Sequence, residues 1–230
     1  MKRIFRRTLL AASFVSIFAS NLTPAMAKKA EVTTTPAVVV APAVAPAKGA
    51  GLAAVKKANE TIAKQLAQKP AAGSEAEKKL AQDVTSTVRG FLDLDELAKR
   101  AVDAHWAKMT DAQRKNYLDL LRSLLEDNYI RGMRSNLAYT VEYVGEAAAP
   151  SPTAMLVQTK INAKRKGRPY SVKVDYTVEA DAKGNVHVVD IATDGVGLIA
   201  NYRAQFNKII TNDGVDGLLA KMKKKQDATK

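Results

Sequence analysis

The sequence predicts an α+β domain in which amphipathic helices cover one face of an antiparallel sheet. Three observations predict this class. Apolar residues recur at helical spacing between Leu52 and Leu125, they alternate with other residues in four stretches between Tyr139 and Val188, and helical spacing returns after Gly197. Helices first, strands next and helices again are typical of an α+β architecture.

Four helices are expected before the strands. The first carries an apolar stripe that includes Val55 and Ile62, and it ends before Pro70. Each of the next three begins at a capping box, in which Ser, Asp or Thr is followed three residues later by Glu or Gln. The three pairs are Ser74 with Glu77, Asp93 with Glu96, and Thr110 with Gln113. The longest helix follows the third pair, and its buried face is expected to carry Tyr117, Leu121, Leu124 and Leu125.

Four strands are expected next, as an antiparallel meander. Their alternating residues are Tyr139, Val141 and Tyr143; Val157, Thr159 and Ile161; Val172, Val174, Tyr176 and Val178; and Val186 and Val188. Residues 164–168 are expected to turn one hairpin and residues 181–185 the next. Two helices close the domain: the first carries Ile199 and Phe206, and Asp213 can cap the second.

Residues 1–27 are expected to be a cleaved signal peptide. Basic residues between Lys2 and Arg7 precede an apolar run from Leu9 to Ala19, and Ala-Met-Ala at residues 25–27 has the small-x-small form of a cleavage site. An exported chain without cysteine fits a bacterial periplasm. Residues 28–50 contain three prolines among alanines and valines, which predicts a flexible linker. Residues 51–225 are then a single domain, and residues 226–230 are a tail.

Composition excludes several kinds of site. The chain has no cysteine, which excludes a disulfide framework, a thiolate zinc site and a cysteine nucleophile. Its two histidines, His105 and His187, are too few for a histidine-rich metal site, and each is expected to be a surface or packed residue. No serine lies in a nucleophile motif, and no phosphate-binding glycine loop occurs. The sequence therefore predicts no enzyme, no catalytic residue, no metal and no cofactor.

A formal net charge of +13 favours anionic partners. Four of the positive charges lie in residues 1–27, so +9 remains after cleavage. Two basic patches are expected. They are the hairpin patch, made of Lys164, Arg165, Lys166 and Arg168, and a tail with Lys221, Lys223, Lys224 and Lys225. Nucleic acid is not the expected partner, because only Tyr170 offers an aromatic ring beside these residues. Anionic lipid headgroups, an acidic partner and solubility alone stay open as explanations.

The apolar face of the expected sheet has two interpretations. Opposed by amphipathic helices, it forms either a solid core or a deep apolar pocket, and the alternation of residues does not distinguish them. Composition alone favours a solid core.

Two groups of motifs bear on this choice. The first group is FLDLDELAKRA at residues 91–101, His105-Trp106, TDAQR at residues 110–114 and Tyr129. The second is VDI at residues 189–191, Gly195-Val196, NYRAQF at residues 201–206 and DGVDGLL at residues 213–219. Together they resemble the MlaC family of periplasmic phospholipid-binding proteins, and the resemblance extends from about Leu52 to Lys225. At Gly197 the sequence departs from the family, which usually has serine there.

The resemblance implies a lipid carrier with a curved sheet, and an apolar pocket between helices and sheet that holds the acyl chains of a phospholipid. The bound phospholipid is cargo, and the implied partners of the monomer are an inner-membrane ABC transporter complex and an outer-membrane lipoprotein complex. Alternation within the strands suggests as pocket candidates Leu121, Tyr139, Val141, Val157, Thr159, Val172, Val174, Tyr176 and Val188. The hairpin patch is the candidate contact for headgroup or partner. Four residues match motif positions and are interpreted first as packing residues: Trp106, Tyr202, Arg203 and Phe206.

Two other classes of protein remain as alternatives. One is an exported small-molecule-binding or adaptor domain of similar build without a lipid cavity. The other is an exported hydrolase with an unfamiliar motif. Bound phospholipid would indicate the carrier, its absence would indicate the adaptor, and turnover of esters would indicate the hydrolase.

Limited proteolysis tests the expected boundaries. We expect the mature chain to begin near Lys28 and a protease to trim it up to about residue 50, because that segment has no periodicity that would bury it. Mass spectrometry of the trimmed product measures the boundary. If the segment resists protease as strongly as the domain does, the boundary lies elsewhere.

Overall fold

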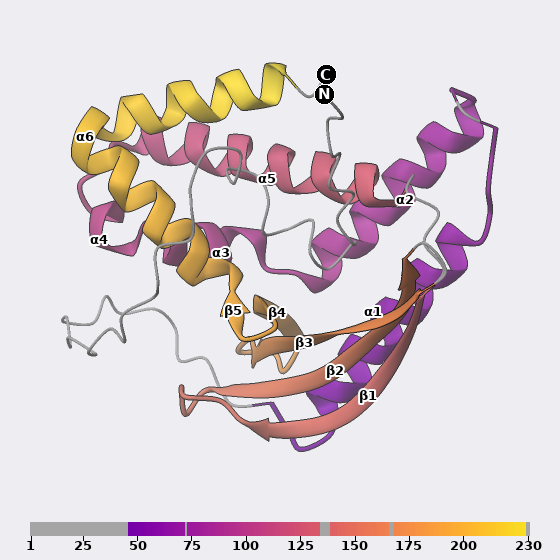
Figure 1. The fold of residues 1–230 in the computed structure, drawn as a ribbon. Coiled ribbons are helices and arrows are strands. Elements are labelled where there is room, and N and C mark those ends of the chain that lie inside the picture. Colours follow the sequence, from indigo (N-terminus) through magenta and orange to yellow (C-terminus); the bar gives the residue numbers. More distant parts are fainter. Residues whose placement is uncertain (1–45, 72, 134–138, 166–167, 229–230) are drawn as a thin grey trace.

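The computed structural model describes residues 46–71, 73–133, 139–165 and 168–228, with the side chains of residues 128–133 and 164–165 left out. Within these residues it contains six helices and one open antiparallel sheet of five strands (Figure 1), which confirms the α+β class. The helices are α1 (Ala50–Leu66), α2 (Glu75–Phe91), α3 (Leu94–Ala101), α4 (Asp103–Trp106), α5 (Asp111–Met133) and α6 (Leu198–Asp227). The strands are β1 (Tyr139–Ala148), β2 (Ala154–Arg165), β3 (Arg168–Ala180), β4 (Val186–Thr193) and β5 (Val196–Gly197).

The predicted capping residues begin their helices, although at Asp93 only half of the box forms, because the Asp93 backbone N–H donates to the Val188 carbonyl. The Ser74 hydroxyl accepts a hydrogen bond from the Glu77 backbone N–H at 3.1 Å, and Asp93 caps α3 in the same way at 2.9 Å. At α5 the box is reciprocal, because Thr110 accepts from the backbone of Gln113 and Gln113 accepts from the backbone of Thr110. These local bonds satisfy donors that a helix start leaves unpaired, so a short sequence pattern is enough to predict them.

The sheet is a meander in the order β1-β2-β3-β4-β5. At the predicted turn between β3 and β4, the Asp181 carboxylate accepts hydrogen bonds from the backbone N–H groups of Lys183 and Asn185. The bonds to Asn185, followed by the one to Lys183, lower the pKa of Asp181 to about 2. The short strand β5 was not expected from alternation, because two residues are too few to show a period.

Helix α6 is longer than either predicted C-terminal helix, because it contains both of them. Gly214 interrupts it with φ +71° and ψ −180°, a conformation that glycine adopts readily and that bends the helix. The expected second start at Asp213 lies at this kink. Lys221 binds the Asp213 carboxylate across the bend.

The sheet curves around α1, which lies in its concave side and contacts β1, β2, β3 and β4 (Figure 1). Helix α2 packs on α1, and α5 and α6 pack against each other farther from the sheet. Helix α3 lies against α5, α6 and β4. Among the residues described, no helix is both long and apolar enough to span a bilayer.

The N-terminus of α1 is bound by a carboxylate from β1. Glu146 accepts hydrogen bonds from the backbone N–H groups of Gly49 and Leu52, both at 2.6 Å. A β-bulge between Tyr143 and Gly145 makes this possible, since it reverses the strand's alternation and brings Glu146 to the concave face. Gly145 adopts φ +152° at the bulge. A negative charge at a helix N-terminus is also favourable towards the helix dipole.

The start of α6 is bound similarly, by Asp190 on β4. One Asp190 oxygen accepts hydrogen bonds from the backbone N–H groups of Ile191 at 2.9 Å and Ile199 at 3.0 Å. A Cβ atom at Gly197 would lie 2.8 Å from the other Asp190 oxygen, so the helix start and the carboxylate meet at the van der Waals limit. Burial raises the pKa of Asp190, although its backbone hydrogen bonds oppose that effect.

A substitution at Gly51 tests how closely α1 approaches the sheet. A Cβ atom there would lie 2.7 Å from Val178 Cγ2 and 2.9 Å from Glu146 Oε1. We expect Gly51→Ala to destabilise the fold by about 1 to 3 kcal/mol in urea unfolding, because α1 would have to move off β3.

Gly90→Ala is the matched control, because a Cβ atom on Gly90 in α2 meets no atom within 4 Å. We expect this substitution to be neutral or to stabilise by up to about 1 kcal/mol, since alanine favours a helix more than glycine does. Equal stability of the two variants would contradict the close packing of α1.

Candidate functional site

The strand register brings eight of the nine predicted pocket residues to the concave face. Paired positions across β2 and β3 are Val157 with Tyr176 and Thr159 with Val174, and Val188 on β4 is opposite Val178. The ninth, Leu121, lies on α5 in the same apolar cluster. Five of the nine are completely buried: Leu121, Val157, Thr159, Val174 and Val188. Val172 and Tyr176 are buried, and Tyr139 and Val141 on edge strand β1 are half-buried.

This face therefore has a depth gradient. Residues on β2, β3 and β4 lie under helices, whereas those on β1 are partly open to solvent. The Phe91 ring at the end of α2 lies 6.4 Å from the Tyr176 ring and joins the apolar lining from the helix side. Sequence reasoning missed Phe91 as a lining residue, because its nearness to β3 depends on how α2 crosses the sheet.

Polar groups gather in the middle of this apolar face. We call them the polar cluster: Asn59, Tyr139, Tyr143, Thr159 and Tyr176. Burial raises the pKa of Tyr176 to about 12, and the neighbouring Asn59 amide and Thr159 hydroxyl oppose that rise. Burial also raises the pKa values of Tyr139 and Tyr143. The Thr159 hydroxyl donates a hydrogen bond to the Val174 carbonyl at 2.8 Å.

Asn59 was not among the predicted site residues. It lies on the face of α1 that carries Val55, Ala58 and Ile62, all buried. A single asparagine in an apolar helical stripe was the signal that could have identified it, because an unpaired buried amide is unfavourable.

The hairpin patch lies only partly within the described structure. The backbones of Arg165 and Arg168 pair across β2 and β3 where the hairpin closes, and Arg168 is exposed. The side chains of Lys164 and Arg165, and all of Lys166, lie outside the described residues. The role of this patch stays a prediction.

The four motif residues make packing contacts. Tyr202 and Phe206 are fully buried on α6, and their rings stack at 5.2 Å. Arg203 donates hydrogen bonds to the Arg100 carbonyl at 2.8 and 3.2 Å, which joins α6 to the end of α3. The guanidinium of Arg114 lies over the Trp106 ring, 5.4 Å from its centroid. The contacts of Arg203 and Trp106 join helices, and Phe206 also meets the Tyr117 ring of α5 edge-on at 5.9 Å.

A strong ion pair fixes α3 beside the sheet. Arg100 donates two hydrogen bonds to the Glu179 carboxylate on β3, at 3.0 and 2.8 Å, and a third to Glu96. Burial alone would lower the pKa of Arg100, but these bonds raise it overall. Bidentate geometry of this kind is rigid, so it positions the helix more than it offers a site for a ligand.

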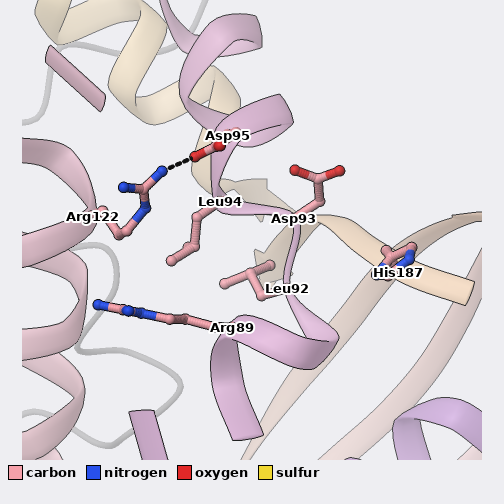
Figure 2. A pocket seen from close by; sticks show the side chains of 7 residues that line it. All are labelled: Arg89, Leu92, Asp93, Leu94, Asp95, Arg122 and His187. Atoms are coloured by element: carbon pink, nitrogen blue, oxygen red, sulfur yellow. Dashed lines mark hydrogen bonds and ion pairs between the residues drawn. The ribbon is translucent and has the colours of Figure 1, made fainter. Parts of the chain in front are cut away.

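A separate surface groove lies between α2, α3, α5 and β4, with a volume of about 350 Å³ (Figure 2). Its charged residues already have partners. Arg89 binds Glu126, and Arg122 binds Asp95, as the dashed line in Figure 2 shows. Asp93 in the same groove caps α3. The groove therefore presents paired charges and no obvious chemistry of its own.

The described residues hold no group of three or more His, Asp or Glu side chains suited to a metal ion. His187 borders the groove, and its Nε2 lies 3.7 Å from Asp181. His105 is half-buried at the end of α4.

The geometry thus defines a class of protein: an α+β domain whose curved sheet presents to its helices an apolar face with a small polar interior. The chain matches the sequence profile of the MlaC protein family over residues 56–224, so it belongs to the MlaC family. This confirms the resemblance in the sequence motifs. No curated protein matches the chain.

A solved structure shares the fold. It is a phospholipid-binding protein from Ralstonia solanacearum in complex with a phospholipid, with a TM-score of 0.66 and 25% sequence identity. The match covers 78% of this chain and 98% of that one. The shared region is thus nearly the whole of the Ralstonia protein.

Proposed function

We propose that this protein is a periplasmic phospholipid carrier that shuttles lipid between outer-membrane and inner-membrane complexes and so maintains the lipid asymmetry of the outer membrane. One observation carries most of the proposal: a member of the MlaC family shares its fold with a protein that was solved with a phospholipid bound. The same match supports a binding and transport role rather than an enzymatic one.

The concave face supports the same role on physical grounds. Transfer of each methylene from water to an apolar site is worth about 0.8 kcal/mol, so two acyl chains supply ample affinity. Val172 and Val174 supply apolar surface on β3, half-buried Val141 extends it to β1, and Phe91 approaches Tyr176 from a helix. The headgroup needs only a polar rim near the surface, which a half-buried edge strand can provide.

The remaining parts of the proposal follow from this role. Residues 1–27 are a signal peptide that is cleaved on export, residues 28–50 are a linker, and residues 51–225 are the lipid-binding domain, with a short tail. The carrier is a monomer with phospholipid as cargo. Its partners are an inner-membrane ABC transporter complex and an outer-membrane lipoprotein complex, and it binds no nucleic acid, metal or organic cofactor.

Native mass spectrometry of the protein purified from the cell envelope tests the proposal. We expect added mass that solvent extraction identifies as phospholipid. A bare protein that also takes up no phospholipid from vesicles would contradict the proposal and favour an adaptor domain. Turnover of an ester panel would favour a hydrolase.

Val174→Trp tests whether the concave face holds acyl chains. Val174 is completely buried on that face, and an indole there takes up volume that a chain would occupy. We expect less copurified phospholipid with a nearly unchanged melting temperature. In a solid core the same change overpacks the structure and typically destabilises by about 1 to 3 kcal/mol.

Ser171→Trp is the matched control for this experiment. It lies on the same strand, is exposed and faces the other side of the sheet. We expect it to retain the parental phospholipid load. A sharp loss of stability in Val174→Trp, with no lipid in the parent protein, would identify the face as ordinary core.

Charge reversal of Lys164, Arg165, Lys166 and Arg168 tests the hairpin patch. We expect slower transfer of lipid to anionic vesicles and little change in melting temperature, because a hairpin tip acts on encounter rate through its electric field. Added salt should diminish the difference between variant and parent.

Four exposed lysines on and after α1 provide a control with the same change in net charge: Lys56, Lys57, Lys64 and Lys69. Their reversal should affect transfer less. Identical effects of the two sets would mean that overall charge, and not the hairpin patch, sets the rate.

A further inference from the structure

The polar cluster contains a buried donor without a well-formed hydrogen bond. The Nδ2 atom of Asn59 is shielded from solvent, and the structure gives it no hydrogen-bond partner. Buried amide groups in proteins are nearly always paired, because leaving one unpaired typically costs about 1 to 3 kcal/mol. An unpaired donor at this depth therefore requires a physical explanation.

The surroundings of Asn59 add further hydroxyl groups. Its amide acts as a weak hydrogen-bond donor to both Tyr143 and Tyr176 and so opposes the rise that burial causes in their pKa values, although neither hydroxyl meets the geometry of a full hydrogen bond. Tyr143 on β1 is opposite Thr159 on β2, and Thr159 is opposite Val174 on β3. Tyr176 is the next residue after Val174 on the same face of β3. The amide of α1 thus faces hydroxyls on β1 and β3, and the Thr159 hydroxyl on the strand between them also approaches Tyr176.

The position of the cluster matches a boundary between polar and apolar surroundings. Tyr139 and Tyr143 on β1 are half-buried, whereas Tyr176 and Thr159 are buried. Tyr143 is opposite Thr159 in the register and Thr159 is opposite Val174, so in this row two hydroxyl groups lead from edge strand β1 to apolar Val174.

The chemistry that fits is a group that only accepts hydrogen bonds and is attached to long apolar chains. We propose that the polar cluster binds the ester carbonyl oxygens of a diacyl lipid, with the Asn59 amide as the central donor and the Tyr143 and Tyr176 hydroxyls beside it. The acyl chains then extend over the valine surface, and the headgroup remains towards solvent beside β1. This inference rests on the proposed carrier function and names the part of the cargo that is recognised inside the protein.

Ester-linked and ether-linked lipids separate this recognition from chain burial. A dialkyl phospholipid has the same headgroup and chain length as its diacyl counterpart but has no carbonyl oxygen. For the full mature protein stripped of lipid, we expect the diacyl form to bind about threefold to tenfold more tightly, as one or two hydrogen bonds allow.

Asn59→Leu should abolish that preference. Leucine is close to asparagine in size but offers no donor, so we expect diacyl affinity to fall to the dialkyl level while dialkyl affinity stays the same or rises. The substitution should weaken the binding of diacylglycerol with the same chains by the same factor as it weakens the binding of diacyl phospholipid, because the cluster contacts the ester and not the phosphate. A loss confined to phospholipid would overturn the assignment to the ester.

Asn207→Leu is the matched control. Asn207 on α6 also has a buried amide atom without a hydrogen bond, but α6 packs on α3, α5 and β4. It should retain the full preference for diacyl lipid. If Asn59→Leu does not fold, Tyr143→Phe removes one half-buried hydroxyl and should reduce the preference about twofold or more.

The outcomes distinguish this inference from the carrier function. A parent protein that binds diacyl and dialkyl phospholipid equally well, or an Asn59→Leu protein that keeps the preference, overturns the ester site and leaves the carrier intact. A parent protein that binds neither lipid contradicts the carrier function itself.

Discussion

The bond between the Glu146 carboxylate and the N-terminus of α1 holds together the two layers on which the site depends. It joins residues almost a hundred positions apart, with two hydrogen bonds of 2.6 Å. Beside this bond, the absence of a Cβ atom at Gly51 lets the start of α1 lie close to Val178 on β3. With that end fixed, the helix crosses the concave face and brings Asn59 over the tyrosines. The position of Asn59 in the polar cluster therefore depends on the bond between Glu146 of β1 and the start of α1.

Asp190 on β4 binds the N-terminus of a second helix, α6, in the same way. Its carboxylate binds the start of α6, and the long helix then carries Tyr202, Arg203 and Phe206 to α3 and α5. Both carboxylates face a helix N-terminus, where unpaired N–H groups and the helix dipole favour negative charge. The starts of α1 and α6 are therefore both anchored to a strand by a carboxylate.

The concave face combines two requirements of a lipid site. Apolar residues on β2, β3 and β4 suit acyl chains, since their contribution is proportional to area and has no directional demand. The hydroxyl and amide groups of the polar cluster, which lie on β1, β2, β3 and α1, add direction, because hydrogen bonds require a defined geometry. Arg100 and Glu179 lie apart from this face in a rigid ion pair that holds α3.

The amino-acid sequence determined what depends on neighbours within a few positions. Capping boxes at Ser74, Asp93 and Thr110, the turn at Asp181, the period of the strands and the family motifs are all local, so they could be predicted without a structure. Only the tertiary structure decided which distant groups meet. The bulge at Gly145 reverses the direction of Glu146, α2 brings Phe91 to Tyr176, and α1 places Asn59 beside Tyr143. These contacts depend on how a helix crosses a curved sheet, and sequence periodicity gives the face of each element but not the angle or the register at which two elements pack.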